Sequence, residues 1–230
     1  MKKIAIIPAR GGSKRIPRKN IKDFLGKPII AYSIQTALDC ALFDEVMVST
    51  DDEEIAEIAK KHGATVPFMR STQNANDHAS TVDVLLEVIN DYKQRSQEFE
   101  LGCCIYPTAP FVSTNLLQQA HDKLTEAQYD TVFPVLPFSF PIQRAVKINR
   151  EARLQMFQPE HLTTRSQDLE KAYHDAGQFY WFQVDVLQEK QKLWTNNTGG
   201  VLLHEMQAHD IDTPEDWEVA EFKFKLATNG

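Results

Sequence analysis

Short apolar runs alternate along the chain with longer segments whose apolar residues recur every three to four positions. The short runs fit buried strands, and the recurring pattern is typical of amphipathic helices. The predicted strands cover residues 3–8, 45–49, 65–69, 101–106 and 131–135. The predicted helices cover residues 28–41, 53–62, 80–92 and 114–127. Because strands and helices alternate, we expect an α/β fold with a doubly wound, mostly parallel sheet and right-handed crossovers.

The alternation breaks at residues 137–173, where prolines interrupt mixed apolar and polar stretches. We interpret this segment as an insertion that leaves the main sheet and returns near Gln178. Further short strands are predicted at residues 178–184, 201–205 and 208–212, and a last helix at residues 214–226. The 230 residues therefore suit one domain, residues 1–230, with a modest insertion.

Acidic residues outnumber basic ones, and the formal net charge is -7. The chain has no basic stripe, which argues against nucleic acid as a partner. No apolar stretch approaches the length of a membrane span, and the apolar run at the start stops at Pro8, too early for a signal peptide. We therefore expect a cytoplasmic protein without a membrane partner. An acidic protein that binds an acidic ligand must gather its basic residues locally.

Residues 8–20, which follow the first predicted strand, gather such basic residues. The five cationic side chains are Arg10, Lys14, Arg15, Arg18 and Lys19. The two adjacent glycines let the backbone approach a ligand and turn its N–H groups toward it. The spacing matches neither standard dinucleotide loop, but doubly wound sheets bind ligands at the carboxyl end of such a strand. The pattern predicts a phosphate site, with a solvated basic loop as the alternative.

The stretch AIIPARGGSKRIPRKNIKDFLGKPII, residues 5–30, resembles the CTP-binding motif of the cytidylyltransferases that activate acidic nine-carbon sugars, such as the CMP-sialic acid synthetases. The similarity covers essentially the whole chain and implies a Rossmann-like fold of the nucleotide-diphospho-sugar transferase type. It also implies that the loop wraps the triphosphate of CTP, with Arg10 and Lys19 as catalytic groups that stabilise the phosphates. The nucleotide-binding residues implied in this loop are Ala9, Arg10, Gly11, Gly12, Ser13, Lys14, Lys19 and Asn20.

Two further stretches fit the nucleotide site of that family. The resemblance places Arg70, Thr81, Pro107 and Thr108 around the cytosine and the ribose. Cytosine is recognised by hydrogen bonds to its amino group and carbonyl, which a hydroxyl, a guanidinium and a backbone carbonyl can supply. A surface arginine and a strand-ending turn are the alternatives. Family members often carry Gln where Tyr106 stands, and that Gln can contact the sugar.

Asp210 and Asp212 precede the last predicted helix. On a strand, both carboxylates would point to the same face, and two carboxylates near a triphosphate suit magnesium. The family carries an Asp-x-Asp at this point, so the resemblance implies Mg²⁺ as a cofactor that neutralises and orients the phosphates. A polar strand end with a helix cap is the alternative, and we interpret Asp216 as part of the helix N-terminus rather than as a ligand.

Residues 164–181 combine cationic, imidazole, amide, carboxylate and aromatic groups, which suit a polar sugar with a carboxylate and apolar substituents. Sialic acid enzymes usually show a basic residue and then Pro-Asn-Gly here, whereas this chain has the sequence HDAG at residues 174–177. That version resembles the branch that acts on pseudaminic acid. The candidate sugar-binding residues are Tyr106, Arg165, His174, Gln178 and Tyr180.

The resemblance implies an enzyme that makes CMP-pseudaminic acid and pyrophosphate from CTP and pseudaminic acid, with Arg165 holding the sugar carboxylate. It also implies a homodimer, because residues 137–173 resemble the dimerisation element of the family. The nearest alternative is the same reaction on sialic or legionaminic acid; 3-deoxy-octulosonate fits less well because that branch has a different loop. A glycosyltransferase that consumes a nucleotide sugar and a non-catalytic nucleotide sensor are alternatives from other classes.

Overall fold

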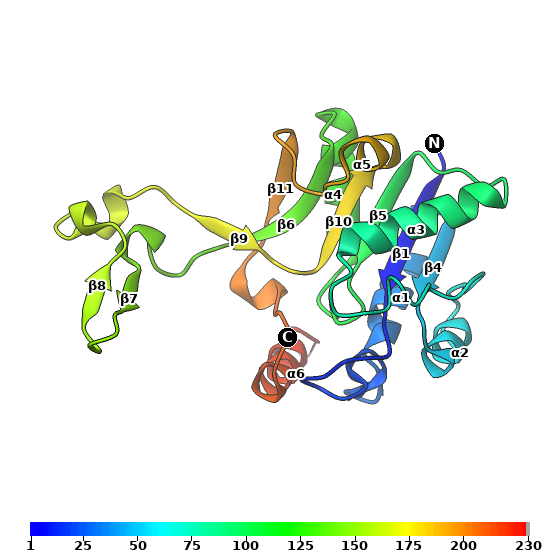
Figure 1. Ribbon diagram of the computed structural model, residues 1–230, viewed down its shortest axis with the longest axis horizontal. Coiled ribbons are helices and arrows are strands. Elements are labelled where there is room, and N and C mark those ends of the chain that lie inside the picture. Colours follow the sequence, from blue (N-terminus) through cyan, green and yellow to red (C-terminus); the bar gives the residue numbers. More distant parts are fainter. Residues whose placement is uncertain (229–230) are drawn as a thin grey trace.

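The computed structural model describes residues 1–228 and is built around one mixed sheet of seven strands (Figure 1). The strand order is β11-β6-β10-β5-β1-β4, and β9 pairs with β6 beyond this path. The strands are β1 (Lys3–Pro8), β4 (Glu45–Ser49), β5 (Leu101–Ile105), β6 (Thr131–Pro137), β9 (Tyr173–Asp175), β10 (Phe179–Gln183) and β11 (Thr198–Leu202). The first strand lies inside the sheet, next to the edge strand β4, and it is parallel to both β4 and β5. The expected α/β fold with a mostly parallel sheet is confirmed.

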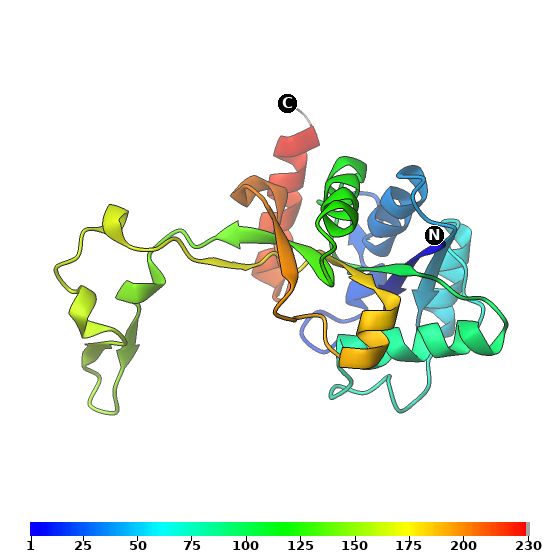
Figure 2. The ribbon, with the colours of Figure 1, turned by 90° about the horizontal axis from the view of Figure 1, so that it is seen from above.

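Helices cover both faces of this sheet, as Figure 2 shows. They are α1 (Ile30–Asp39), α2 (Glu53–Lys61), α3 (Thr81–Gln94), α4 (Thr114–Glu126), α5 (Val184–Lys190) and α6 (Pro214–Thr228). The apolar residues of α1, α2 and α4 form one buried cluster with one face of the strands, and those of α3 and α5 form a second cluster with the other face. Each layer therefore buries the apolar stripe that the sequence pattern predicts. Within residues 1–228, no helix combines the length and the apolar composition needed to cross a membrane.

The helix starts follow the expected capping chemistry. The side chain of Asp52 accepts from the Ile55 backbone N–H at the start of α2, and Ser80 forms a reciprocal capping box with Asp83 at the start of α3. Thr213 and Asp216 exchange similar bonds before α6, whose first residue is Pro214. The interpretation of Asp216 as a helix-terminal residue is therefore confirmed.

Several predicted strands have other bounds in the structure or are absent from it. Residues 65–69 form only an isolated bridge between Thr65 and Met47, since Pro67 has no N–H to continue a ladder. Residues 208–212 are not part of a strand, and the strand predicted at 201–205 begins earlier, as β11. The pattern also missed that β10 runs antiparallel between β5 and β6.

Two small hairpins stand outside the main sheet. One joins β2 (Asp23–Phe24) to β3 (Lys27–Pro28) after the basic loop, and the other joins β7 (Val146–Ile148) to β8 (Leu154–Met156). Short 3-10 turns occur at Lys19–Ile21, Ile142–Arg144, Pro159–His161, Ser166–Asp168 and Glu205–Gln207.

The segment between β6 and β9, residues 138–172, extends away from the sheet as an arm (Figures 1 and 2). Apolar side chains on it are exposed to solvent, with Phe140 82% and Ile148 72% accessible. The expectation that this segment leaves the main sheet therefore agrees with the structure. An arm of this kind buries little of its own apolar surface.

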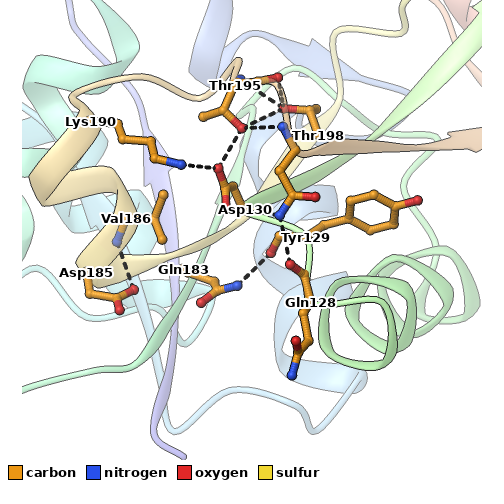
Figure 3. Close-up of polar contacts among 10 residues, drawn as sticks. Gln128, Tyr129, Asp130, Gln183, Asp185, Val186, Lys190, Thr195 and Thr198 are labelled. Atoms are coloured by element: carbon orange, nitrogen blue, oxygen red, sulfur yellow. Dashed lines mark hydrogen bonds and ion pairs between the residues drawn. The ribbon is translucent and has the colours of Figure 1, made fainter.

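Asp130, at the turn between α4 and β6, joins three segments that are distant in the sequence (Figure 3). Its carboxylate accepts hydrogen bonds from Lys190 of α5 and from the Thr195 hydroxyl, both at 2.7 Å, and from the Asn197 amide at 3.2 Å. These bonds fasten the loop that follows α5 to the edge of the sheet. They also lower the pKa of the Asp130 carboxyl group.

We expect Asp130→Asn to lower the free energy of unfolding by about 1–3 kcal/mol, because the buried carboxylate that accepts from Lys190, Thr195 and Asn197 is lost. Since the pKa of Asp130 is lowered in the folded protein, this contribution is present at neutral pH and is lost as pH falls through the folded value. Urea unfolding at pH 7 and at acidic pH measures both effects. Asp185→Asn on α5 is the matched control, because among the described residues its carboxylate accepts only from the neighbouring Val186 N–H. Equal effects of the two substitutions would contradict this role for Asp130.

Candidate functional site

A cavity of about 270 Å³ opens at the carboxyl ends of β1 and β5. This is the edge where parallel strands of a doubly wound sheet present their loops to ligands. The cavity is lined by Pro8, Arg10, Ser13, Lys14, Arg15, Ile16, Lys19, Asn20, Tyr106, Pro107, Thr108, Asp210 and Asp212. Residues from the start, the middle and the end of the chain therefore meet at one place, and most of them were singled out by the sequence. The sequence analysis named Arg15 only among the cations of the predicted phosphate loop, and it did not assign Pro8 or Ile16 to the site.

The basic loop that follows β1 is held by backbone anchors. The N–H of buried Ala9 donates to the Ser49 carbonyl at 2.9 Å, and the Asn20 amide donates to the Arg10 carbonyl at 2.9 Å. The N–H of Gly11 donates to the Asp51 carboxylate rather than facing the cavity. Ala9 and Gly11 therefore shape the loop, in contrast to the expectation that the Gly11 N–H points at the ligand. Space around Gly12 is open.

Gly11 also has a steric reason to be glycine. A Cβ atom on it would lie 2.7 Å from a carboxylate oxygen of Asp52. That carboxylate caps α2 and binds Arg18, so it has little freedom to move. The close approach of the loop to α2 therefore depends on the absence of a side chain at this position.

Four of the five cations in the loop lie in the cavity wall, and each is paired with an acid. Arg10 and Lys14 both bind the carboxylate of Asp77. Arg15 binds Asp212 at 2.8 Å, and Lys19 lies 3.5 Å from the same carboxylate. The fifth cation, Arg18, turns away to Asp52 and Glu54, so it does not line the cavity. The cavity thus concentrates positive charge in an acidic protein.

Asp210 and Asp212 reach the cavity without a strand. Ile211, which lies between them, is 1% exposed and packs with Ile16 and Trp217. Because Ile211 points into this cluster, its two neighbours project together to the opposite side, where both line the cavity. Both carboxylates therefore face the cavity, as expected, although residues 208–212 do not form the predicted strand. The Lys19 ammonium donates to the Ile211 carbonyl at 2.6 Å and joins this segment to the basic loop.

The chemistry of the two carboxylates fits a divalent cation. Burial, reinforced by the neighbouring charge of Asp212, raises the pKa of Asp210, so an added positive charge would relieve both effects. No group of three or more His, Cys, Asp or Glu residues suited to a metal occurs within residues 1–228. A cation held here would therefore need oxygen ligands from a substrate, as Mg²⁺ in nucleotide sites commonly does.

The predicted base-site residues divide into two groups. Pro107 and Thr108 follow β5 and line the cavity. Arg70 is 8% exposed and donates to the side chain and carbonyl of Ser49, so in this structure it braces the end of β4. Its guanidinium is not in the cavity wall, and burial lowers its pKa. Thr81 lies at the start of α3, with its hydroxyl 3.3 Å from that of Tyr106.

A second hollow, of about 410 Å³, adjoins the first through Tyr106, which lines both. Its wall is largely apolar and aromatic, with Tyr180, Leu193 and the exposed ring of Trp194, which packs on Phe133 at a centroid distance of 4.8 Å. Sequence reasoning assigned Tyr180 but missed Leu193 and Trp194. They lie in a loop without a motif, held by the Asp130 contacts described above.

Of the candidate sugar-binding residues, Tyr106 and Tyr180 line this hollow, and the others lie elsewhere. The Tyr180 hydroxyl donates to Asp175, whose other oxygen accepts the Gly177 N–H at 2.8 Å. Gly177 has a φ of 63° and lies against Asp210, so the turn between β9 and β10 reaches the acidic pair. Burial raises the pKa of Tyr180, which keeps its hydroxyl protonated to donate this bond.

The remaining predicted sugar residues do not line either hollow in this chain. Gln178 is 1% exposed, and its amide donates to the Gln207 carbonyl at 2.7 Å. His174 is exposed on β9 and packs beside Phe138. Arg165 lies on the arm and pairs with Asp168 at 2.7 Å. Within one chain, therefore, the structure does not bring these three side chains together with the cavity.

Comparison with known proteins agrees with this architecture. The sequence matches the cytidylyltransferase family over residues 4–206. It is 44% identical over 226 residues to the pseudaminic acid cytidylyltransferase of Campylobacter jejuni subsp. jejuni serotype O:23/36 (strain 81-176), covering 98% of this chain and 97% of that one. It is 30% identical over 230 residues to the CMP-N,N'-diacetyllegionaminic acid synthase of Legionella pneumophila subsp. pneumophila (strain Philadelphia 1), covering 98% and 97%.

A solved structure shares the fold. A CMP:2-keto-3-deoxy-manno-octonic acid synthetase complexed with CTP aligns over 100% of both chains with a TM-score of 0.70 at 21% identity. This likeness concerns the fold alone. The family match and the identity to relatives over nearly the whole length establish more: this chain belongs to the cytidylyltransferases, and it is a nucleotidyltransferase.

Proposed function

We propose that this enzyme transfers CMP from CTP to pseudaminic acid and releases pyrophosphate. The observation that carries the proposal is the cavity in which four cations of the basic loop meet the carboxylates of Asp210 and Asp212. Such a site matches a polyphosphate that is bound through cations and a metal. The 44% identity to a pseudaminic acid cytidylyltransferase over nearly the full chain supports the choice of sugar.

In this reaction, the anomeric hydroxyl of the sugar attacks the α-phosphorus of CTP. One P–O bond forms, the bond to the β-phosphate oxygen breaks, and the hydroxyl proton is lost to an acceptor that we do not assign. Arg10, Lys14 and Lys19 bind the phosphates and stabilise the charge that moves onto the pyrophosphate. The rate enhancement then rests on positioning and on charge neutralisation.

We propose Mg²⁺ as the cofactor, held by Asp210 and Asp212. When bound, it would neutralise phosphate oxygens and orient them for displacement. Two contacts of the protein would position these carboxylates. The packing of Ile211 keeps them on one side of the segment, and the hydrogen bond from Lys19 to the Ile211 carbonyl holds the segment beside the basic loop.

The second hollow supports a sugar with apolar substituents. It adjoins the nucleotide cavity at Tyr106, and its aromatic wall of Tyr180 and Trp194 suits methyl and acylamino groups better than a row of hydroxyls. We therefore place the sugar across Tyr106, with its anomeric end toward the cavity. Because CTP is the donor, we propose that the enzyme works in the cytoplasm.

We also propose a homodimer in which the arm of one subunit reaches the site of the other. The arm exposes apolar side chains that include Phe140 and Phe157, and Arg165 on the arm does not line the cavity of its own chain. Association would bury the apolar surface and bring the Arg165 guanidinium to the sugar carboxylate of the partner's site.

Pyrophosphate release with CTP, Mg²⁺ and one sugar at a time tests the reaction. We expect release with pseudaminic acid and little with N-acetylneuraminic acid. Lys19→Met should lower kcat/KM about 10²–10³-fold because a cation that contacts the phosphates is lost. Lys22→Met is the matched control, since Lys22 lies over the ring of Trp217 outside the cavity.

Release only with sialic or legionaminic acid would keep the chemistry and overturn the sugar assignment. CTP binding without pyrophosphate release from any acidic sugar would favour a glycosyltransferase or a nucleotide sensor instead.

Complementation between two inactive variants tests the shared site. We expect Lys19→Met and Arg165→Ala to be inactive alone and to regain about a quarter of wild-type activity when they are refolded together in equal amounts. In a two-fold dimer, half of the molecules are mixed, and each mixed dimer has one site with both native residues. Activity and mass by light scattering measure the outcome. No recovery from mixed dimers would show that Arg165 serves its own chain.

A further inference from the structure

The loop between Arg70 and α3, residues 71–80, extends to the basic loop, where it contacts two cations of the cavity wall. Its base is fastened to α3, where Glu87 accepts from the Ser71 N–H at 2.6 Å and from the Ser71 hydroxyl at 2.9 Å, and also binds the Asn74 amide. Its far end is a tight turn in which Asn76 accepts from the N–H groups of His78 and Ala79. The turn projects one side chain, Asp77, toward the basic loop.

Within residues 1–228, the hydrogen bonds and ion pairs that join this loop to the basic loop all end on Asp77. One carboxylate oxygen binds Arg10 at 2.5 Å and the other binds Lys14. These two cations line the nucleotide cavity, and the side chain of Asp77 remains 39% exposed. The two cations hold the pKa of Asp77 near 2, so it is charged throughout the physiological range.

A carboxylate bridging two cations uses the same donors as a phosphate group. Arginine and lysine bind both kinds of anion through charge-assisted N–H bonds, so a triphosphate in the cavity and Asp77 compete for Arg10 and Lys14. The negative charge of Asp77 also opposes the approach of a polyanion. Because the contact is exposed and the loop has no other polar contact to the basic loop, it can open without disturbing the core.

We infer that Asp77 is an internal competitor for the triphosphate: it holds residues 71–80 against the basic loop in the free enzyme, and nucleotide binding releases the loop. This inference rests on the proposed nucleotide site. Its consequence for turnover is that Asp77 weakens the binding of CTP and re-forms its pairs as pyrophosphate leaves, which favours product departure.

Binding measurements in metal-free buffer test the competition. We expect Asp77→Asn to bind CTP and inorganic tripolyphosphate about three- to tenfold more tightly than the wild type, because two exposed ion pairs no longer compete. Binding of cytidine, which lacks phosphate, should not change. Asp91→Asn on α3 is the control for net charge, since the Asp91 carboxylate makes no ion pair among the described residues. Asp77→Ser should reproduce the result of Asp77→Asn.

Hydrogen–deuterium exchange gives a second readout. Tripolyphosphate has no base to contact Arg70 or Thr81, so it should speed exchange at residues 71–79 in the wild type and have little effect in Asp77→Asn. Unchanged or weaker binding by Asp77→Asn, or slower exchange in the wild type, would overturn the inference while leaving the nucleotide site intact. Failure of the wild type to bind CTP and tripolyphosphate would overturn the nucleotide site itself, and the competitor with it.

Discussion

The burial of Ile211 beneath the basic loop is the interaction on which the candidate site depends. Ile211 packs with Ile16, Phe24 and Trp217, and this third apolar cluster joins the C-terminal helix to the loop that follows the first strand. Aromatic edges reinforce the joint, with the rings of Phe24 and Trp217 5.6 Å apart. Without this cluster, the acidic pair would have no reason to lie beside the cations, since almost the whole chain separates them. The chemistry is therefore assembled by apolar packing, and the charges take positions that the packing sets.

The cavity wall gathers positive charge, whereas the composition of the whole protein is acidic. The protein is acidic overall, yet the cavity wall carries four cations. Each is balanced by a carboxylate from another segment, which keeps the free protein from accumulating like charges at one edge. The pairs of Arg10, Lys14 and Arg15 are exposed, so each of these is weak and exchangeable. A site of this kind can be stable without its substrate and still give up its internal partners to a stronger anion.

The sequence predicted the elements whose pattern is local and left out what depends on distant contacts. β1, β4 and the amphipathic helices were readable because their apolar residues follow the strand or helix period. The antiparallel direction of β10 is set by neighbours far along the chain, so no local signal contains it. The loop cations and the Asp-x-Asp could be recognised as sequence motifs. Trp194 could not, because it lines the second hollow only when its loop is held by the contacts of Asp130. Arg70 was visible too, but its burial against Ser49 follows from the tertiary fold.

The interior place of the first strand in the sheet has a consequence for synthesis on the ribosome. β1 leaves the exit tunnel before either of its two partners, and the second of them, β5, begins at residue 101. The nascent chain therefore carries an almost wholly apolar strand with at least one uncovered edge until β5 has emerged. The basic residues directly after β1 emerge during that interval, whereas Asp212, the carboxylate partner of Arg15 and Lys19, is synthesised long after β5. Long-range pairing of this kind slows folding and lengthens the period in which the chain depends on chaperones.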